Sequence, residues 1–179
     1  SYDMSNVHII VISSEHDLSK GSQQHAWLKE DLKLVNRKVT PWVVLESHRP
    51  LYESQMEIDK LDMKEKVSIV GDGLRDEFEW LLRHVDLVLS GHYHSYLRTC
   101  SGLFQGVCDN GGPQYITVGT AGAPLLSAGL YGPYLNFTER FITSYGYGRI
   151  TVKSSRKLFF EFVDDADGSV LDSVWLSKK

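Results

Sequence analysis

Residues 87–94 read LVLSGHYH, an apolar run that ends in a glycine and two histidines. Residues 42–48 read WVVLESH and have a similar order, with an apolar run that ends close to a histidine. Short aliphatic runs without polar alternation are typical of strands that are covered on both faces. We therefore predict two buried strands, over 42–45 and 87–89, with histidines following their carboxyl ends.

Segments with helical periodicity lie beside these strands. The apolar spacing over 23–35 predicts an amphipathic helix with Ser22 as its N-cap, and 74–85 carry a second helical stripe. Residues 7–13, VHIIVIS, predict a further buried strand near the start of the chain. The order strand, helix, strand, helix, strand indicates an α/β fold with a parallel or mixed sheet.

The second part of the chain is rich in strand candidates. One strand is predicted over 115–120, and three more over 149–152, 158–163 and 170–176, after a glycine-rich and aromatic loop region. The last two are joined by 164–168, DDADG, which has the residues of a hairpin turn. A chain of 179 residues is expected to form one domain.

The composition is that of a soluble folded domain. Hydrophobic residues make up 42% of the chain and charged residues 23%, which excludes the disordered and collagen-like classes. The 19 basic and 23 acidic residues are scattered and give a net charge of −4, so nucleic acid is not an expected partner. No apolar stretch approaches the ~18 residues of a membrane span, so a membrane partner is not expected either.

Two cysteines and one asparagine bear on the compartment. Cys100 and Cys108 flank a short segment with two glycines, which favours a local disulfide over the alternative of two buried free thiols. Asn136 begins Asn-Phe-Thr, an acceptor triplet for N-glycosylation. Together these features predict a secreted or vacuolar/lysosomal glycoprotein.

Three histidines are candidate metal ligands. His48, His92 and His94 follow strand ends, and the carboxyl ends of parallel strands meet in the crevice where ligands bind. Imidazole is a common ligand of Zn, Fe, Cu and Mn, so the three side chains predict a metal site. The alternative is three polar loop residues that bind nothing. His16, in the exit loop of the first strand, is expected to line the same site and to contact substrate.

Residues 42–52, WVVLESHRPLY, resemble the VxxH block of plant-type purple acid phosphatases, which belong to the calcineurin-like metallophosphatase superfamily. Residues 91–94, GHYH, are similar to the GHxH block of the same proteins. The similarity continues through 14–17, 96–100 and 145–152, and so extends over most of the chain. It implies the C-terminal half of a metallophosphatase α/β/β/α sandwich, with a mixed sheet, flanking helices and a C-terminal β-hairpin.

The resemblance also implies metal roles and a missing segment. His48 and His92 are expected to bind a divalent ion (Zn, Mn or Fe), and His94 is expected to bind Fe(III). The family's Asp-x-Gly, Gly-Asp-x-x-Tyr and Gly-Asn-His blocks do not occur before His48, and the similar Gly-Asp-Gly at 71–73 is interpreted as a helix-start turn. We therefore expect 1–179 to be the C-terminal part of a catalytic domain whose bridging carboxylate lies upstream.

The implied activity is hydrolysis of phosphomonoesters by a hydroxide at a two-metal centre. Arg49 is expected to contact the substrate phosphate, although a surface salt bridge is an equally common role for such an arginine. The isolated chain is expected to be inactive, to need the N-terminal half of its domain as a partner and to self-associate. Two alternatives stay open: a calcineurin-like phosphodiesterase or nucleotide hydrolase, and a metallophosphatase-like domain without catalysis.

Overall fold

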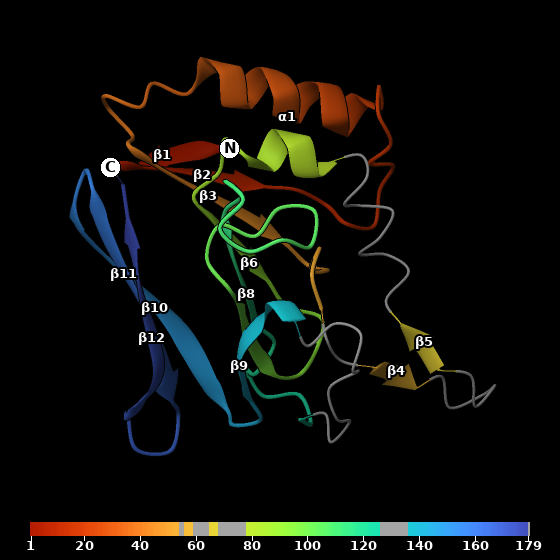
Figure 1. The fold of residues 1–179 in the computed structure, drawn as a ribbon, viewed down its shortest axis with the longest axis vertical. Helices are drawn as coiled ribbons and strands as arrows, with labels where there is room; N and C mark the ends of the chain where they lie inside the picture. The colour runs from red at the N-terminus through yellow and green to blue at the C-terminus, as the bar shows by residue number, and fades with distance from the viewer. Residues whose placement is uncertain (54–55, 59–64, 68–77, 126–135, 179) are drawn as a thin grey trace.

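Two β-sheets pack against each other in the computed structural model, which describes residues 1–53, 56–58, 65–67, 78–125 and 136–178 (Figure 1). The larger sheet has the strand order β1-β2-β3-β6-β8-β7-β9, and the smaller has the order β10-β11-β12. The strands of the two sheets are β1 (Tyr2–Met4), β2 (Val7–Val11), β3 (Trp42–Ser47), β6 (Leu87–Ser90), β7 (Tyr96–Thr99), β8 (Gln114–Val118), β9 (Thr138–Ile142), β10 (Gly146–Ser154), β11 (Lys157–Asp164) and β12 (Val170–Ser177).

The four central strands of the larger sheet are parallel. β3 lies between β2 and β6, and β6 pairs with β8 on its other side. These strands correspond to the segments predicted over 7–13, 42–45, 87–89 and 115–120, so that part of the prediction is confirmed. The strands predicted over 149–152, 158–163 and 170–176 are confirmed as β10, β11 and β12, with a hairpin between the last two.

Strand β9 corrects the expectation of a loop before residue 145. It pairs antiparallel with β7 at the edge of the larger sheet. Its sequence, TERFI, leaves Glu139 and Arg140 exposed, so it contains no apolar run that sequence reasoning could detect. β7 and the short β1 were not predicted either. Their strand character depends on the neighbours with which they pair, because β-propensity is strongly context-dependent.

The helices cover one face of the larger sheet (Figure 1). Helix α1 (Gln23–Leu34) begins after Ser22, whose hydroxyl accepts a hydrogen bond from the His25 amide at 3.2 Å, so the predicted N-cap is confirmed. Leu28 of α1 is fully buried in the core on this face. Residues 78–82 form the described part of the second helix, and the predicted start of that helix lies outside the described residues.

The smaller sheet covers the opposite face. Val43 and Leu45 point into the core under the helices, whereas Trp42 and Val44 point into the core that contains Phe160 and Phe162 of β11. This alternation follows from the two-residue period of a strand. The layers are therefore helices, mixed sheet and antiparallel sheet, which confirms the predicted α/β architecture with its C-terminal hairpin.

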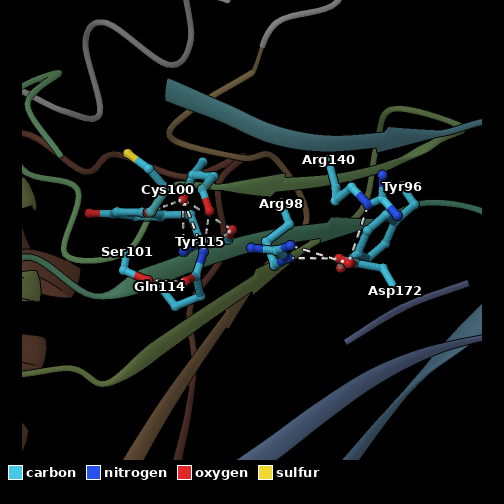
Figure 2. A network of polar contacts seen from close by, with 9 residues as sticks. Tyr96, Arg98, Cys100, Ser101, Gln114, Tyr115, Arg140 and Asp172 are labelled. Atoms are coloured by element: carbon cyan, nitrogen blue, oxygen red, sulfur yellow. Dashed lines mark hydrogen bonds and ion pairs between the residues drawn. The ribbon is translucent and has the colours of Figure 1, made fainter. Parts of the chain in front are cut away.

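A buried ionic network links the two sheets (Figure 2). Asp172 of β12 accepts hydrogen bonds from the Tyr96 hydroxyl and the Arg98 Nε, both at 2.7 Å, and Arg140 lies 3.5 Å away. Burial favours the neutral carboxyl, but the hydrogen bonds from Arg98 and Tyr96 outweigh it and lower the pKa of Asp172. The network therefore fastens β7 and β9 to β12 through one ionised carboxylate.

A disulfide closes the loop that follows β7. Cys100 and Cys108 are joined, which confirms the predicted pair. Beside the loop, the side-chain Nε2 of Gln114 donates to the Thr99 carbonyl at 2.7 Å, and the Ser101 hydroxyl lies 3.4 Å from the Gln114 Oε1 (Figure 2). These contacts fix the start of the loop against β8. Asn136, the predicted glycosylation acceptor, is exposed just before β9.

The remaining described segments are short. β4 (Met56–Ile58) and β5 (Glu65–Val67) pair antiparallel. The turn interpreted at 71–73 lies outside the described residues. Among the helical segments that the structure describes, none combines the length and the apolarity needed to cross a bilayer.

His8 of β2 bridges two neighbouring elements. Its Nδ1 lies 2.6 Å from an Asp3 oxygen of β1, and its Nε2 lies 3.0 Å from an Asp31 oxygen of α1. Ionised carboxylates only accept hydrogen bonds, so the ring satisfies both partners only when both of its nitrogens are protonated. Burial of the ring opposes this charge, but the hydrogen bonds to Asp31 and Asp3 outweigh it and raise the pKa of His8 above 6.5.

We expect His8→Gln to destabilise the protein more at acidic pH than at alkaline pH. A raised pKa means that the stabilisation is complete below pH 6.5 and is lost as the pH rises through the folded-state pKa. The loss should be on the order of 1–2 kcal/mol at pH 5.5 and should shrink towards pH 9. Urea unfolding at both pH values measures it, with the exposed His84→Gln as control. An equal loss at both pH values would contradict the bridge.

We expect Asp172→Ala to lower the free energy of unfolding by roughly 3–5 kcal/mol, because it leaves Arg98, whose side chain is only 12% exposed, without its carboxylate. Thermal or denaturant unfolding measures the loss. Asp165→Ala is the control, because this exposed aspartate lies in the turn next to the same strand. Its effect should stay within about 0.5 kcal/mol. Similar losses in the two variants would show that Asp172 does not hold the sheets together.

Candidate metal centre at the strand ends

The register of β3 and β6 places the candidate histidines. Ser47 and Ser90, the last residues of the two parallel strands, are paired opposite each other. The Gly91 amide then donates to the His48 carbonyl at 3.0 Å, which keeps the two exit loops together beyond the sheet. His48 and His92 therefore leave the sheet at the same level and on the same edge.

The imidazoles of His48 and His92 are in contact. The His92 Nδ1 lies 3.1 Å from the His48 Nε2, and the ring centroids are 5.0 Å apart. His92 adopts φ 65°, a left-handed conformation that is uncommon for a residue with a side chain. Such backbone strain is often found at functional sites. The turn at His92 is therefore held by the surrounding loop.

Gly119 supports this loop, and sequence reasoning did not assign it to the site. Its amide donates to the Ser95 carbonyl at 3.0 Å. A Cβ at this position would lie 1.8 Å from the Tyr93 carbonyl oxygen, so only glycine fits. Gly119, which directly follows β8, is thus part of the site's scaffold. Its signal in the sequence is only a glycine after a strand, which has many other causes.

The contact with Arg49 indicates which nitrogen of His92 carries a proton. The Arg49 Nη1 lies 3.3 Å from the His92 Nε2, and a guanidinium can only donate. The His92 Nε2 therefore accepts, and the His92 Nδ1 carries the proton that it donates to the His48 Nε2. The two facing nitrogens share one proton, and the same two nitrogens would be the ligands of a metal ion.

The geometry of the pair fits a bound metal ion. Two nitrogen ligands with bonds of about 2.1 Å to one ion lie roughly 3.0–3.4 Å apart for bond angles between octahedral and tetrahedral. The observed separation of 3.1 Å is within this range. The neutral form of imidazole is the one that binds metals.

His94 is held separately from the pair. Its Nδ1 lies 2.9 Å from the Pro124 carbonyl oxygen, to which it donates, so its Nε2 is the nitrogen left to bind a ligand. Metal-binding histidines commonly donate their second nitrogen to such an oxygen. Within the described residues, no three His, Cys, Asp or Glu side chains are grouped closely enough to hold an ion. The structure thus brings two of the three candidates together, and the metal role of His94 stays a prediction.

The exit loop of β2 supplies the rim of the site. The Glu15 carboxylate accepts from the Arg49 Nε at 2.7 Å, and the Ser14 hydroxyl accepts from the Arg49 amide at 3.0 Å. The hydrogen bond from Arg49 is the main cause that lowers the pKa of Glu15. His16 makes its hydrogen bond within the loop, to the Ser13 hydroxyl at 2.7 Å, and its predicted substrate contact remains untested.

Two cavities adjoin these loops. One, of about 300 Å³, lies between the sheets and is lined by Ser47, Ser90, Gly91 and Phe160 among others. The other, of about 600 Å³, is lined by His16 and by the first turn of α1. Both cavities lie beside the strand ends, but neither lining includes His48 or His92.

Two family models match the chain. Residues 3–96 match the model described as calcineurin-like phosphoesterase, and residues 112–173 match the model described as iron/zinc purple acid phosphatase-like protein C. The first segment contains His48, His92 and His94, and the second begins just before β8.

Individual relatives agree with the models. The chain is 36% identical to probable purple acid phosphatase 20 of Arabidopsis thaliana, over 99% of this chain and 41% of the relative. It is 29% identical to the Fe(3+)-Zn(2+) purple acid phosphatase 12 of the same plant, over 98% of this chain and 39% of the relative. The chain thus spans about two fifths of these relatives.

A solved structure shows the same fold. The purple acid phosphatase PPD1 from yellow lupin (Lupinus luteus) seeds superimposes with a TM-score of 0.83 at 26% identity, over 98% of this chain and 32% of the lupin chain. The matched sequence segments, the relatives and the superposition agree on one family. The chain therefore belongs to the calcineurin-like phosphoesterases and, within them, to the purple acid phosphatases.

Proposed function

We propose that this chain is the C-terminal part of a metal-dependent acid phosphatase that hydrolyses phosphomonoesters. The observation that carries the proposal is the contact between the His48 Nε2 and the His92 Nδ1, 3.1 Å apart at the strand ends. The names of the relatives, which are purple acid phosphatases, support the reaction class.

We assign the three candidate histidines to two different ions. His48 and His92 would hold a divalent ion such as Zn, Mn or Fe, and His94 would hold Fe(III) through its Nε2. A pair of bound ions supplies Lewis-acid polarisation of a phosphoryl group and activation of water. For the divalent ion to bind through the His92 Nδ1, the proton on that nitrogen would move to Nε2, and protonation of either imidazole to the cation would block the ion, so protons compete with metal at this pair.

Arg49 would bind the substrate phosphate. It follows His48 directly, and its guanidinium reaches His92, so its charge lies beside the pair of nitrogens. A guanidinium remains protonated at every physiological pH and matches the geometry of phosphate oxygens. Arg49 would therefore hold the negative charge of a phosphoester next to the ions.

This chain would bind metal weakly when isolated. Its three candidate ligands are neutral imidazoles, which offer no bridging oxygen and no charge to compensate a trivalent ion. We propose that a further segment of the catalytic domain supplies the remaining ligands and acts as the partner of this chain. The uncovered surface would then favour self-association of the isolated chain.

The compartment proposed for the protein is extracellular or vacuolar/lysosomal. The Cys100–Cys108 disulfide forms in oxidising compartments, and the exposed Asn136 is accessible to glycosylation. Neither feature involves the metal site. The compartment and the activity are therefore independent proposals.

A second candidate is a phosphodiesterase or nucleotide hydrolase. The match of residues 3–96 to calcineurin-like phosphoesterases favours it, because this description does not specify a monoester. The purple acid phosphatase match over 112–173 favours the first candidate. Rates with p-nitrophenyl phosphate and bis-p-nitrophenyl phosphate on the full-length protein distinguish the two.

We expect His48→Ala and His92→Ala each to weaken Zn²⁺ binding by the chain about tenfold or more, because each removes half of the paired site. Calorimetric titration with Zn²⁺ at pH 7 measures the affinity. Binding should also weaken at pH 5, where protons occupy the imidazoles. His84→Ala, an exposed histidine, is the control. Unchanged affinity in both site variants would exclude the pair as a metal site.

We expect the isolated chain to hydrolyse p-nitrophenyl phosphate at least 100-fold more slowly than the full-length protein. The physical reason is the incomplete ligand set, since two-metal catalysis requires both ions in place. Initial rates at pH 5 with added Fe³⁺ and Zn²⁺ measure the difference. Comparable rates, with iron bound stoichiometrically to the chain, would show that this chain completes the site by itself.

A further inference from the structure

Two side chains of the β2 exit loop hold Arg49 at two different points. The Ser14 hydroxyl accepts from the Arg49 amide at 3.0 Å, and the Glu15 carboxylate accepts from its Nε at 2.7 Å. Ser14 and Glu15 also contact each other, with Oγ and Oε1 3.1 Å apart. The backbone and the side chain of Arg49 are thus attached to the same loop, which lies about 35 residues earlier in the sequence.

The attachment restrains the guanidinium. Glu15 holds the group at Nε, and Nη1 lies 3.3 Å from the His92 Nε2, so two of its three nitrogens have defined neighbours. Without Glu15, Nε would lose the acceptor that orients it, and the side chain would gain rotamer freedom.

The ion pair between Glu15 and Arg49 contributes little to the stability of the fold. The Glu15 side chain is 51% exposed and that of Arg49 is 28% exposed, and ion pairs at such exposed positions contribute little to folding. Removing Glu15 should therefore leave the fold intact. Any functional effect of its removal then reports on the position of Arg49 and not on unfolding.

We propose that Glu15 is a positioning residue that orients Arg49 to receive the phosphate group of the substrate. This inference rests on the phosphatase function proposed above. A guanidinium held in the bound orientation before the substrate arrives loses less rotamer freedom on binding.

Steady-state kinetics of the full-length, metal-loaded protein with p-nitrophenyl phosphate test the proposal. Glu15→Ala should raise KM about threefold to tenfold and change kcat less, as expected when substrate binding is weakened. Glu15→Gln keeps an acceptor for Nε and should restore most of the KM. Adding Glu15→Ala to Arg49→Ala should raise KM no further, because the two residues act through one group.

The control is a similar ion pair in the smaller sheet, which contributes none of the candidate ligands. Glu161 of β11 binds Arg149 of β10 at 3.0 Å in the smaller sheet. Glu161→Ala should leave KM unchanged. A KM for Glu15→Ala equal to that of the wild type, or additive effects of Glu15→Ala and Arg49→Ala, would overturn the proposal.

A second readout is independent of activity. In the ¹⁵N-labelled full-length protein, the Arg49 Nε–Hε signal should be protected from exchange, and Glu15→Ala should reduce that protection whereas Glu161→Ala should not. Equal exchange in wild type and Glu15→Ala would show that Glu15 does not hold the guanidinium.

If the full-length wild type hydrolyses no phosphoester, the proposed function fails and this proposal with it. If the wild type is active and Glu15→Ala matches it, only this proposal fails.

Discussion

The parallel pairing of β3 with β6 is the constraint on which the rest of the site depends. Ser47 lies opposite Ser90, and their hydroxyl oxygens are 3.2 Å apart, so the two strands end at the same level. A shift of one residue would turn alternate side chains to the opposite face of the sheet. Because both faces are covered by apolar cores, the register is fixed, and the contact between His48 and His92 follows from it.

Coupling between the two sheets stabilises the loop that carries His92 and His94. β7 begins two residues after His94, and it is fastened to β12 by the buried Asp172. Gly119 holds the same loop from the end of β8. The smaller sheet contributes no candidate ligand, yet it stabilises the strands from which the ligands leave. Stability and function are thus connected through β7, because loss of the Asp172 carboxylate would also loosen the loop that carries the candidate metal ligands.

The charges near the histidine pair bear on the chemistry proposed for it. Arg49 brings a permanent positive charge, and the Glu15 carboxylate accepts a hydrogen bond from it. In the proposed function, Arg49 would attract an anionic substrate, and further anionic ligands would be needed to hold two cations. Metal affinity and substrate affinity would therefore be carried by different groups, which makes them separable by mutation.

The sequence by itself determined the central strands, helix α1 with its cap Ser22, the disulfide and the positions of the histidines at the strand ends. These features are local, since an apolar run, a helical period or a short cysteine spacing is visible within a few residues. Only the tertiary structure decided that β9 is a strand, that Gly119 underlies the site and that Glu15 holds Arg49. Each of these depends on contacts between residues far apart in the chain, whose geometry is set by strand register and by the packing of loops.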